Sequence, residues 1–384
     1  MTGTIFVEAS SAASCPHLFR ASTSFARQDV DGRDKHGHDG GNGLVIEKAV
    51  DLGQGTKGSL RFNGVRCMTA AAEVPDVSTH IQLATMERPP AGDAPREGEA
   101  PTAYAAPRTL ADALELLRAG DATILAGGTD LMPQSKAGRF RLQRMLVNIR
   151  RVPELHGISE SDGVVRLGAL TTITELLESS LVRARFNALW QACDHFASDQ
   201  LRNAATIGGN ICNASPAGDL LVPLLVFNAR VVLGSKPDGA LTMRSVSLAD
   251  FFDAPGRTRR AANELLVAIE IPLPPAGFVS EFYKFGARPA LDIAAISIGL
   301  GAVRVRDRLS DVRVAFGAVA PTPIRAPQTE AALDGNVLVT SIEAALEAAE
   351  ADISPISDIR ASEWYRRELV RNMLRRMLEH VSPG

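Results

Sequence analysis

The chain has 384 residues, of which 45% are hydrophobic and 22% charged, and its formal net charge is −3. This length gives room for two or three domains with buried cores. The charge gives no reason to expect nucleic acid or an anionic membrane as a partner, and no apolar run approaches the roughly 20 residues that span a bilayer. No secretory signal is visible, and four cysteines make no disulfide framework, so we expect a cytoplasmic protein with reduced thiols.

Residues 1–100 differ in composition from the rest of the chain. Residues 31–43 (DGRDKHGHDGGNG) are turn-forming and charged, and residues 88–101 (RPPAGDAPREGEAP) have the composition of a flexible, Pro-rich linker. Residues 59–85 are compatible with two or three short strands. We therefore expect an atypical, partly flexible N-terminal extension. For His36 and His38, a solvated glycine-rich loop is a simpler interpretation than a metal site.

From residue 108 onward, hydrophobic periodicity predicts regular elements. Residues 109–120 are predicted to form a helix, capped by Thr109 and ended by Gly120, with one apolar face made of Leu110, Ala113, Leu114 and Leu117. Further elements follow in chain order: strands at 122–127, 144–152 and 164–170, a short helix capped by Thr171 or Thr172, a long helix near 183–196, a helix at 220–227 and a strand at 229–235.

A second unit is expected to start near residue 277. Strands are predicted at 280–288, 294–307 and 309–321, with a turn at Asp307–Ser310. Two helices close the chain, at 341–352 and 362–381, and the second carries Tyr365, Leu369, Met373 and Met377 on one side. Helices and strands do not alternate regularly, which favours an α+β fold.

Two glycine-rich stretches interrupt these elements: AGGTDL (126–131) and TIGGNICNASPAGD (206–219). Neither is a Walker loop, since no Gly-Lys-Ser/Thr follows, and neither has the Rossmann glycine spacing. Each could be a tight turn at a strand end. Both nevertheless combine small residues with a threonine hydroxyl where backbone amides can converge. Facing each other, the two would bind a pyrophosphate through dipoles without Lys or Arg.

Five segments in order carry a family resemblance: ILAGGTDLM, LGALTTITEL, LRNAATIGGNICNASPAGDLLVPLL, LLVAIEIPLP and FYKFGARPALDIAAIS. Together they resemble the FAD-binding subunit of molybdenum hydroxylases, a family that includes xanthine dehydrogenase, carbon monoxide dehydrogenase and 4-hydroxybenzoyl-CoA reductase. The resemblance runs from about residue 101 to the C-terminus. It implies an α+β fold: a two-lobed, p-cresol-methylhydroxylase-type FAD-binding domain over 101–276, with lobes at about 101–160 and 161–276. An α+β domain of the carbon monoxide dehydrogenase flavoprotein C-terminal type would follow over 277–384.

The resemblance also implies the residues of the site. Most of them belong to the two glycine-rich stretches: Leu125, Ala126, Gly127, Gly128, Thr129 and Asp130 in the first, and Thr206, Gly208, Gly209 and Asn210 in the second. Asp219 would accept hydrogen bonds from sugar or ribityl hydroxyls. Phe196 would border the cofactor, Leu266 would form an apolar wall, and Lys284, with Asp292, would approach from the second unit.

Simpler interpretations exist for several of these residues. Without the resemblance, Phe196 and Leu266 are ordinary core positions and Lys284 is an edge-strand lysine. Cys193 and Cys212 are expected to be small, buried, apolar residues. No catalytic base and no metal ligand are predicted, because electron transfer needs no base.

The function implied is a FAD-binding subunit that passes electrons from iron–sulfur clusters through noncovalent FAD to NAD⁺ or another acceptor. Molybdopterin is expected on a large partner subunit and [2Fe–2S] clusters on a small one. Residues 1–100 hold only Cys15 and Cys67, whereas such a cluster needs four thiolates, so this segment is at most a degenerate ferredoxin-like remnant. Two alternatives stay open: a stand-alone FAD-dependent oxidase of the same superfamily, and a flavin-free scaffold subunit.

Overall fold

The computed structural model describes residues 61–62, 65–66, 101, 103–288 and 291–381. Its contacts divide the chain into two units, residues 1–85 and 86–384. In the first unit, β1 (Arg61–Phe62) pairs antiparallel with β2 (Val65–Arg66). The other predictions for residues 1–100, on Cys15, Cys67 and the two histidines, fall outside the described residues.

The second unit begins with a small parallel sheet in the order β3-β5-β4, made of Ala103–Ala105, Met145–Asn148 and Ala122–Leu125. Helix α1 (Leu110–Leu117) connects β3, which was not predicted, to β4. Its cap and buried face are as predicted: the Thr109 hydroxyl accepts a hydrogen bond from the Asp112 amide, and the four apolar residues of the predicted face are buried. A short helix, α2 (Leu131–Lys136), follows β4. The first glycine-rich stretch therefore lies at the carboxyl end of a parallel strand, where α/β sheets commonly bind ligands.

The second sheet is antiparallel and has the order β6-β7-β12-β8-β9. Its strands are Ile158–Ser161, Val164–Gly168, Leu265–Pro272, Arg230–Ser235 and Thr242–Ser247. The central strand, β12, is the last of the five in the sequence and pairs with both β7 and β8. Smaller elements border this sheet: the 3-10 helices Pro153–Leu155 and Leu248–Asp250, and the hairpin of β10 (Phe252–Ala254) with β11 (Arg257–Thr258).

Six short helices follow β7 in the chain: α3 (Ile173–Glu178), α4 (Ser180–Arg185), α5 (Asn187–Asp194), α6 (Asp199–Arg202), α7 (Ile207–Asn213) and α8 (Leu221–Val226). Buried residues of all of them except α6 share one hydrophobic core with β7, β8 and β12. Thr172, rather than Thr171, caps α3, in a capping box with Glu175. The long helix predicted near 183–196 is wrong, because the chain leaves helical geometry at Phe186 (φ −130°, ψ 59°). The Phe186 ring is fully buried and meets Phe227 edge-on at 5.0 Å, so core packing fixes this break.

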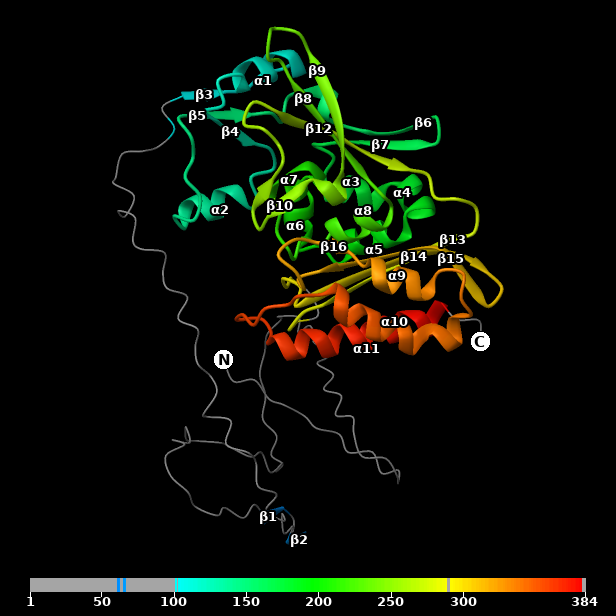
Figure 1. Cartoon of the computed structure of the whole chain (residues 1–384). Helices are drawn as coiled ribbons and strands as arrows, with labels where there is room; N and C mark the ends of the chain where they lie inside the picture. Colours follow the sequence, from blue (N-terminus) through cyan, green and yellow to red (C-terminus); the bar gives the residue numbers. More distant parts are fainter. Residues whose placement is uncertain (1–60, 63–64, 67–100, 102, 289–290, 382–384) are drawn as a thin grey trace, which may run out of the picture. The chain divides into compact units, whose positions relative to one another are not determined.

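The C-terminal part contains an antiparallel sheet in the order β13-β14-β15-β16, made of Phe278–Phe285, Ile296–Val305, Arg308–Gly317 and Ile324–Arg325. Val305 pairs with Arg308, so the β14–β15 turn is centred on Arg306 and Asp307, slightly earlier than predicted. Figure 1 shows this sheet between two helical layers, with α5 and α8 on one side and α9 (Pro327–Leu333), α10 (Leu338–Asp352) and α11 (Glu363–Val381) on the other.

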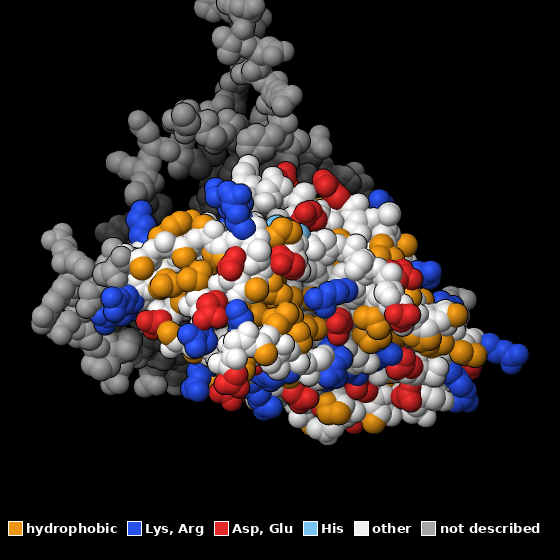
Figure 2. Space-filling model, turned by 90° about the horizontal axis from the view of Figure 1, so that it is seen from above, with side chains coloured by type: hydrophobic (Ala, Val, Ile, Leu, Met, Phe, Trp, Pro, Cys, Tyr) orange, Lys and Arg blue, Asp and Glu red, His pale blue; other side chains and the backbone are white. Residues whose placement is uncertain are grey.

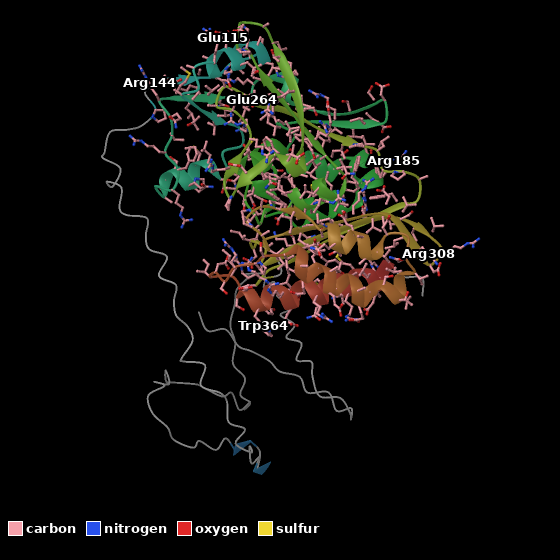
Figure 3. All side chains as sticks on the ribbon, viewed as in Figure 1. Glu115, Arg144, Arg185, Glu264, Arg308 and Trp364 are labelled. Atoms are coloured by element: carbon pink, nitrogen blue, oxygen red, sulfur yellow. The ribbon has the colours of Figure 1, made fainter. Side chains whose placement is uncertain are left out.

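Helix α11 differs from the prediction in which residues it buries. Leu369 and Met377 are buried as expected, but Tyr365 is 39% exposed and Arg366 is buried instead. The Arg366 guanidinium donates to the Ala295 carbonyl and to Asp358, so its charge is bound rather than solvated. Trp364, at the start of α11 in Figure 3, is exposed.

The surface agrees with the modest net charge. On the face shown in Figure 2, acidic and basic side chains are interspersed, with apolar areas between them. Within the described part of the chain, none of the helices has the length and apolar character needed to cross a membrane.

Candidate functional site

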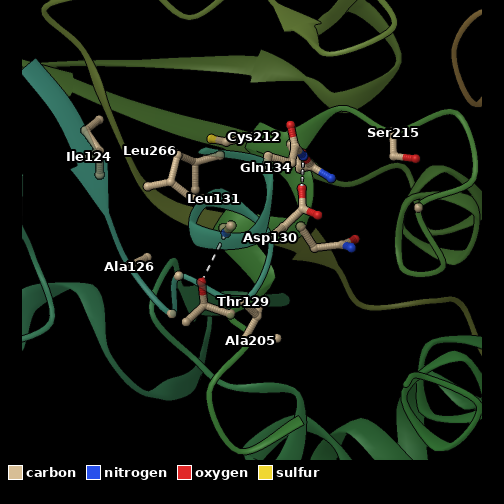
Figure 4. Close-up of a pocket in the computed structure, with 18 of the residues that line it drawn as sticks. Ile124, Ala126, Thr129, Asp130, Leu131, Gln134, Ala205, Cys212, Ser215 and Leu266 are labelled. Atoms are coloured by element: carbon tan, nitrogen blue, oxygen red, sulfur yellow. Dashed lines mark hydrogen bonds between the residues drawn. The ribbon is translucent and has the colours of Figure 1, made fainter. Parts of the chain in front are cut away.

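A cavity of about 740 Å³ lies where the small parallel sheet faces the second sheet and its helices. This volume is in the range of sites that enclose small molecules or cofactors. The wall includes the first glycine-rich stretch, the start of α7, the chain after α5, residues 215–219, the start of β12 and residues 291–293. Figure 4 shows part of the wall, with Asp130, Gln134, Cys212 and Leu266 around the same space.

The first glycine-rich stretch lines this cavity. Gly128 has a φ of +71°, which glycine adopts without strain and which turns the chain away from β4. None of the backbone amides of Ala126–Leu131 donates to an acceptor among the described residues. A row of free amides at the end of a strand forms an anion-binding concavity. The stretch therefore fits a phosphate-containing ligand.

The second glycine-rich stretch is not the loop that was predicted, because TIGGN is the first turn of α7. Thr206 caps this helix and its hydroxyl accepts from the Gly209 amide at 3.1 Å. The amide of Ile207 donates to the Thr171 carbonyl at 3.0 Å, and that of Gly208 to the Ala169 carbonyl at 2.9 Å. The Asn210 amide donates to the Thr206 carbonyl, so these amides already have partners within the protein.

Glycine is needed at two positions of α7 for different structural reasons. A Cβ on Gly208 would lie 2.6 Å from the Ala169 carbonyl oxygen, so this glycine lets α7 pack closely on the chain after β7. A Cβ on Gly209 would approach only the Thr206 hydroxyl, at 2.9 Å, and the residue is exposed in the cavity wall. Gly209 therefore keeps space free in the cavity.

A glutamine that the sequence analysis missed links the two stretches. The Gln134 amide group donates to the Asp130 carboxylate and, at 3.3 Å, to the Asn213 side-chain oxygen (Figure 4). Gln134 stands one helical turn after Asp130, and this i,i+4 spacing is the signal that could have identified it. The contact joins α2 to the end of α7 across the cavity.

Asp219 is the buried carboxylate of the wall. Its Oδ2 accepts from the Lys284 ammonium at 2.7 Å, while its Oδ1 is buried and has no partner among the described residues. Burial raises the pKa of Asp219, although the nearby Lys284 acts in the opposite direction. A buried acceptor without a partner in a cavity wall suits a ligand that brings a hydroxyl donor.

All predicted site residues except Leu125 and Lys284 line the cavity, and Asp292 lines it too. Leu125 lies in β4, and Lys284 lies behind Asp219. The sequence analysis missed several wall residues besides Gln134: Ile124, Leu131, Phe140, Arg260, Leu291 and Ile293.

The two cysteines differ from each other. Cys193 is buried as predicted, and burial raises its pKa to about 12. Cys212 was expected to be a buried core residue, but it is only half-buried and lines the cavity. Burial of its thiol nevertheless raises the pKa of Cys212. Cys212 is therefore kept as a neutral thiol, the form that is a poor nucleophile.

The charges of the wall restrict how an anion can be bound. Among the described residues that line the cavity, Asp130, Asp219 and Asp292 are acidic and Arg260 is the single cation. Arg260 already donates to the backbone carbonyls of Ala261 and Glu264. A diphosphate would therefore depend mainly on the free amides of the first stretch.

Comparison with known proteins agrees with this fold and site. Residues 99–274 match the family described as the FAD binding domain in molybdopterin dehydrogenase, and residues 281–381 match the carbon monoxide dehydrogenase flavoprotein C-terminal domain. These matches define a flavoprotein class of oxidoreductase subunits.

Individual relatives show more specifically to which family the chain belongs. The xanthine dehydrogenase FAD-binding subunit of Escherichia coli O157:H7 is 36% identical over 277 residues, which cover 71% of this chain and 93% of that protein. The carbon monoxide dehydrogenase medium chain of Hydrogenophaga pseudoflava is 32% identical, and the match covers 72% of this chain and 95% of that protein. A solved structure of carbon monoxide dehydrogenase from that organism superposes with a TM-score of 0.68 at 33% sequence identity. The superposition covers 72% of this chain and 96% of that chain. The chain belongs to the FAD-binding subunits of the molybdenum hydroxylase family.

The predicted family, α+β fold class, FAD cofactor and oxidoreductase class are thereby confirmed. The residues present also fit FAD: free backbone amides suit its diphosphate, and the orphan oxygen of Asp219 suits one of its hydroxyls. Phe196 and Leu266 supply apolar wall for its rings.

Proposed function

We propose that this chain is the electron-transfer flavoprotein of a multi-subunit molybdenum enzyme in the cytoplasm. A large subunit would carry molybdopterin and a small one [2Fe–2S] clusters, and electrons would leave through this chain to NAD⁺ or another acceptor. When bound, FAD supplies the redox chemistry, and the protein supplies binding, orientation and electrostatics. The observation that carries the proposal is the row of free amides at Ala126–Leu131 in a cavity of cofactor size.

The site residues divide the work by chemistry. The amides after Leu125 would hold the diphosphate, with the Thr129 hydroxyl beside them. The TIGGN turn would shape the cavity through Thr206, Gly208, Gly209 and Asn210 rather than donate its amides. We further propose domain boundaries at 101–276 and 277–384, which the family matches at 99–274 and 281–381 support.

FAD would be held noncovalently. The thiol of Cys212 lies in the wall, but burial raises its pKa and disfavours the nucleophilic thiolate. Acid precipitation of the purified protein should release all of the flavin into the supernatant. Flavin that remains on the precipitated chain, and is lost in Cys212→Ala, would show a covalent bond.

The first experiment is purification of the tagged full-length chain from a host that makes molybdenum cofactor. We expect a visible flavin spectrum with about one FAD per chain and copurification of a molybdenum-containing large subunit and an iron–sulfur small subunit. A colourless chain that takes up no added FAD would contradict the proposal and support a flavin-free scaffold. A yellow chain without partners that oxidises an alcohol or amine by itself would support a stand-alone oxidase.

The acceptor needs a separate test. Anaerobic addition of NADH to the purified complex should bleach the flavin if NAD⁺ is the physiological acceptor, because hydride transfer is reversible. If NADH leaves the spectrum unchanged while a quinone or oxygen reoxidises the reduced complex, another acceptor is used.

A further inference from the structure

The chain between α10 and α11 carries large apolar side chains on its outside. Ile356 is 70% exposed, Ile359 is 95% exposed and Trp364 is 69% exposed, and the partly exposed Tyr365 stacks on Trp364 with 6.4 Å between the ring centroids. We call these four residues the α11 patch. Single exposed hydrophobic residues are normal on a protein surface, whereas a group of them is typical of an interaction site.

The turn that carries the α11 patch is held in a defined conformation. The Asp358 carboxylate accepts from the Arg360 amide at 2.9 Å and from the Ala361 amide at 3.1 Å. The buried Arg366 guanidinium donates to the same carboxylate at 2.7 Å and also to the Ala295 carbonyl. The exposed side chains therefore stand on a preorganised backbone, which lowers the entropy cost of docking.

Contacts connect the patch to one edge of the cavity. The Tyr365 ring meets Phe285, at the end of β13, edge-on at 6.1 Å. The Ala295 amide donates to the Phe285 carbonyl at 2.7 Å. In the chain just before Ala295, Leu291 and Ile293 line the cavity and are 56% and 51% exposed. Exposed apolar side chains thus extend from the cavity edge to the start of α11.

The charges around the patch are balanced. Neighbouring charged side chains form ion pairs with each other: Arg288 with Asp292, Arg360 with Asp358, and Arg367 with Glu363. The surface therefore has an apolar centre and a paired, polar rim, which is the arrangement of a protein–protein interface. A partner that docks here would do so mainly through apolar contact.

The position of the patch selects one kind of partner. In the proposed function, FAD in the cavity receives electrons from an iron–sulfur cluster on another chain. Electron transfer between two proteins requires that their redox groups come close together, so the donor has to dock beside the cavity. Interfaces of electron-transfer partners are small, and a patch of a few anchoring side chains suits them.

We propose that the α11 patch is the docking surface for the iron–sulfur subunit. An apolar surface of that subunit would cover Ile359 and Trp364 and bring its cluster to the cavity edge at Leu291 and Ile293. The inference rests on the proposed function, because it assigns a surface to one partner of the same electron-transfer chain. The four side chains of the patch have no part in holding FAD.

Titration of the FAD-loaded, full-length chain with the purified iron–sulfur subunit tests this, with isothermal titration calorimetry at low and at high salt. The patch variants are Ile359→Asp and Trp364→Ser. Val339→Asp is the matched control: Val339 is 65% exposed and lies near the bridge of Val337 with Arg308. Figure 3 shows Arg308 and Trp364 at opposite ends of the C-terminal part.

Three further measurements accompany each titration. The same chains are titrated with the molybdenum-containing subunit, and each chain alone is examined by analytical ultracentrifugation. Flavin content and thermal midpoint are recorded for every variant.

We expect each patch variant to bind the iron–sulfur subunit at least about 10-fold more weakly, because a few apolar and aromatic anchors carry most of the energy of an interface. Flavin content and thermal midpoint should stay at the wild-type values, since the changed side chains are exposed. Wild-type affinity should vary little with salt, because apolar contact is not screened. Val339→Asp should bind like the wild type.

Wild-type affinity in both patch variants would overturn the inference. It would also fail if the patch variants lose affinity only for the molybdenum-containing subunit, or if they abolish a self-association that the wild-type chain shows alone. Weaker binding that only follows a lowered thermal midpoint would overturn it as well. In all these cases the wild type still binds FAD and the iron–sulfur subunit, and the proposed function stands. A wild-type chain that binds no iron–sulfur subunit overturns both.

Discussion

The two glycine-rich stretches share a glycine pair and a threonine but contribute differently to the site. In Ala126–Leu131 the backbone amides have no acceptor in the described part of the chain, and they remain available to a ligand. In the TIGGN turn the amides of residues 207–210 are all bonded within the protein. A glycine pair thus indicates that the backbone closely approaches either a ligand or another part of the protein. The hydrogen-bond partners of its amides distinguish these two cases.

The strongest test of this difference is Gly127→Ala. A Cβ at Gly127 would lie 1.9 Å from the Ala204 carbonyl oxygen, so the first stretch would have to move away from the chain that leads into α7. We expect a loss of about 2–3 kcal/mol in unfolding free energy, the range for overpacking against a rigid neighbour. FAD affinity should fall by about 100-fold or more, because several amide hydrogen bonds would be misplaced.

Urea unfolding and FAD titration of the flavin-free protein measure both effects. Gly138→Ala is the matched control, because Gly138 lies on the same connection with nothing within 4 Å of an added Cβ. Alanine at the Gly138 φ of +69° should cost only about 1 kcal/mol of unfolding free energy and leave FAD affinity intact. A Gly127→Ala chain with wild-type stability and flavin content would contradict the close contact.

Gly209→Ala should separate ligand binding from folding. The residue is helical, so alanine gains about 1 kcal/mol of helix preference, which offsets a small shift of the Thr206 hydroxyl. We expect the flavin-free chain to melt within a few degrees of wild type and FAD affinity to drop about 10-fold or more, since the methyl group enters the cavity. Differential scanning calorimetry with FAD titration checks this, and unchanged affinity would show that FAD does not approach α7.

Glu264→Gln provides a reference position outside both stretches. The Arg244 hydrogen bonds, helped by the Ala261 amide, hold the pKa of Glu264 below its ordinary value of 4.5. Because the folded-state pKa is lowered, the stabilisation is complete above pH 4.5 and is lost as the pH falls below it. The variant should lose about 1 kcal/mol at neutral pH, given a half-exposed arginine partner.

Urea unfolding as a function of pH tests this expectation. The difference between wild type and Glu264→Gln should shrink below pH 4.5. Glu115→Gln, at a half-exposed carboxylate that pairs with Arg118 and Lys236, should change stability by only a few tenths of a kcal/mol. A constant difference at all pH values would show that packing, and not charge, is what Glu264 contributes. Figure 3 shows Glu264 and Glu115 in the same part of the fold.

Gln134→Ala should have the smallest effect, because it removes only the two side-chain hydrogen bonds from Gln134 to Asp130 and to Asn213. We expect about 2- to 10-fold weaker FAD binding, the value of one neutral hydrogen bond. Hydrogen exchange at the amides of Ala126–Leu131 should also become faster in the FAD complex. Lys136→Ala, on an exposed position of the same helix, is the control. If both variants behave like wild type, α2 is held by something other than Gln134.

The sequence by itself determined several local elements of this protein. Helix α1 could be predicted with its cap and its buried face, because Thr109 and the apolar spacing act within a few residues. The cap of α3, narrowed to Thr171 or Thr172, and the strands β13, β14 and β15 also have local signals. The five ordered segments identified the family and hence FAD, which no single element would have done.

Only the tertiary structure decided how distant segments meet. Strand β12 lies between β7 and β8, and Phe186 breaks a helix because it packs on Phe227. TIGGN became a helical turn because Thr171 and Ala169 accept its first amides, and Lys284 lies behind Asp219 because β13 docks on α5. Each of these contacts depends on a partner whose position is set by packing and hydrogen bonding across the fold. Periodicity and capping patterns describe only what a residue does with its near neighbours, so they could not have revealed these contacts.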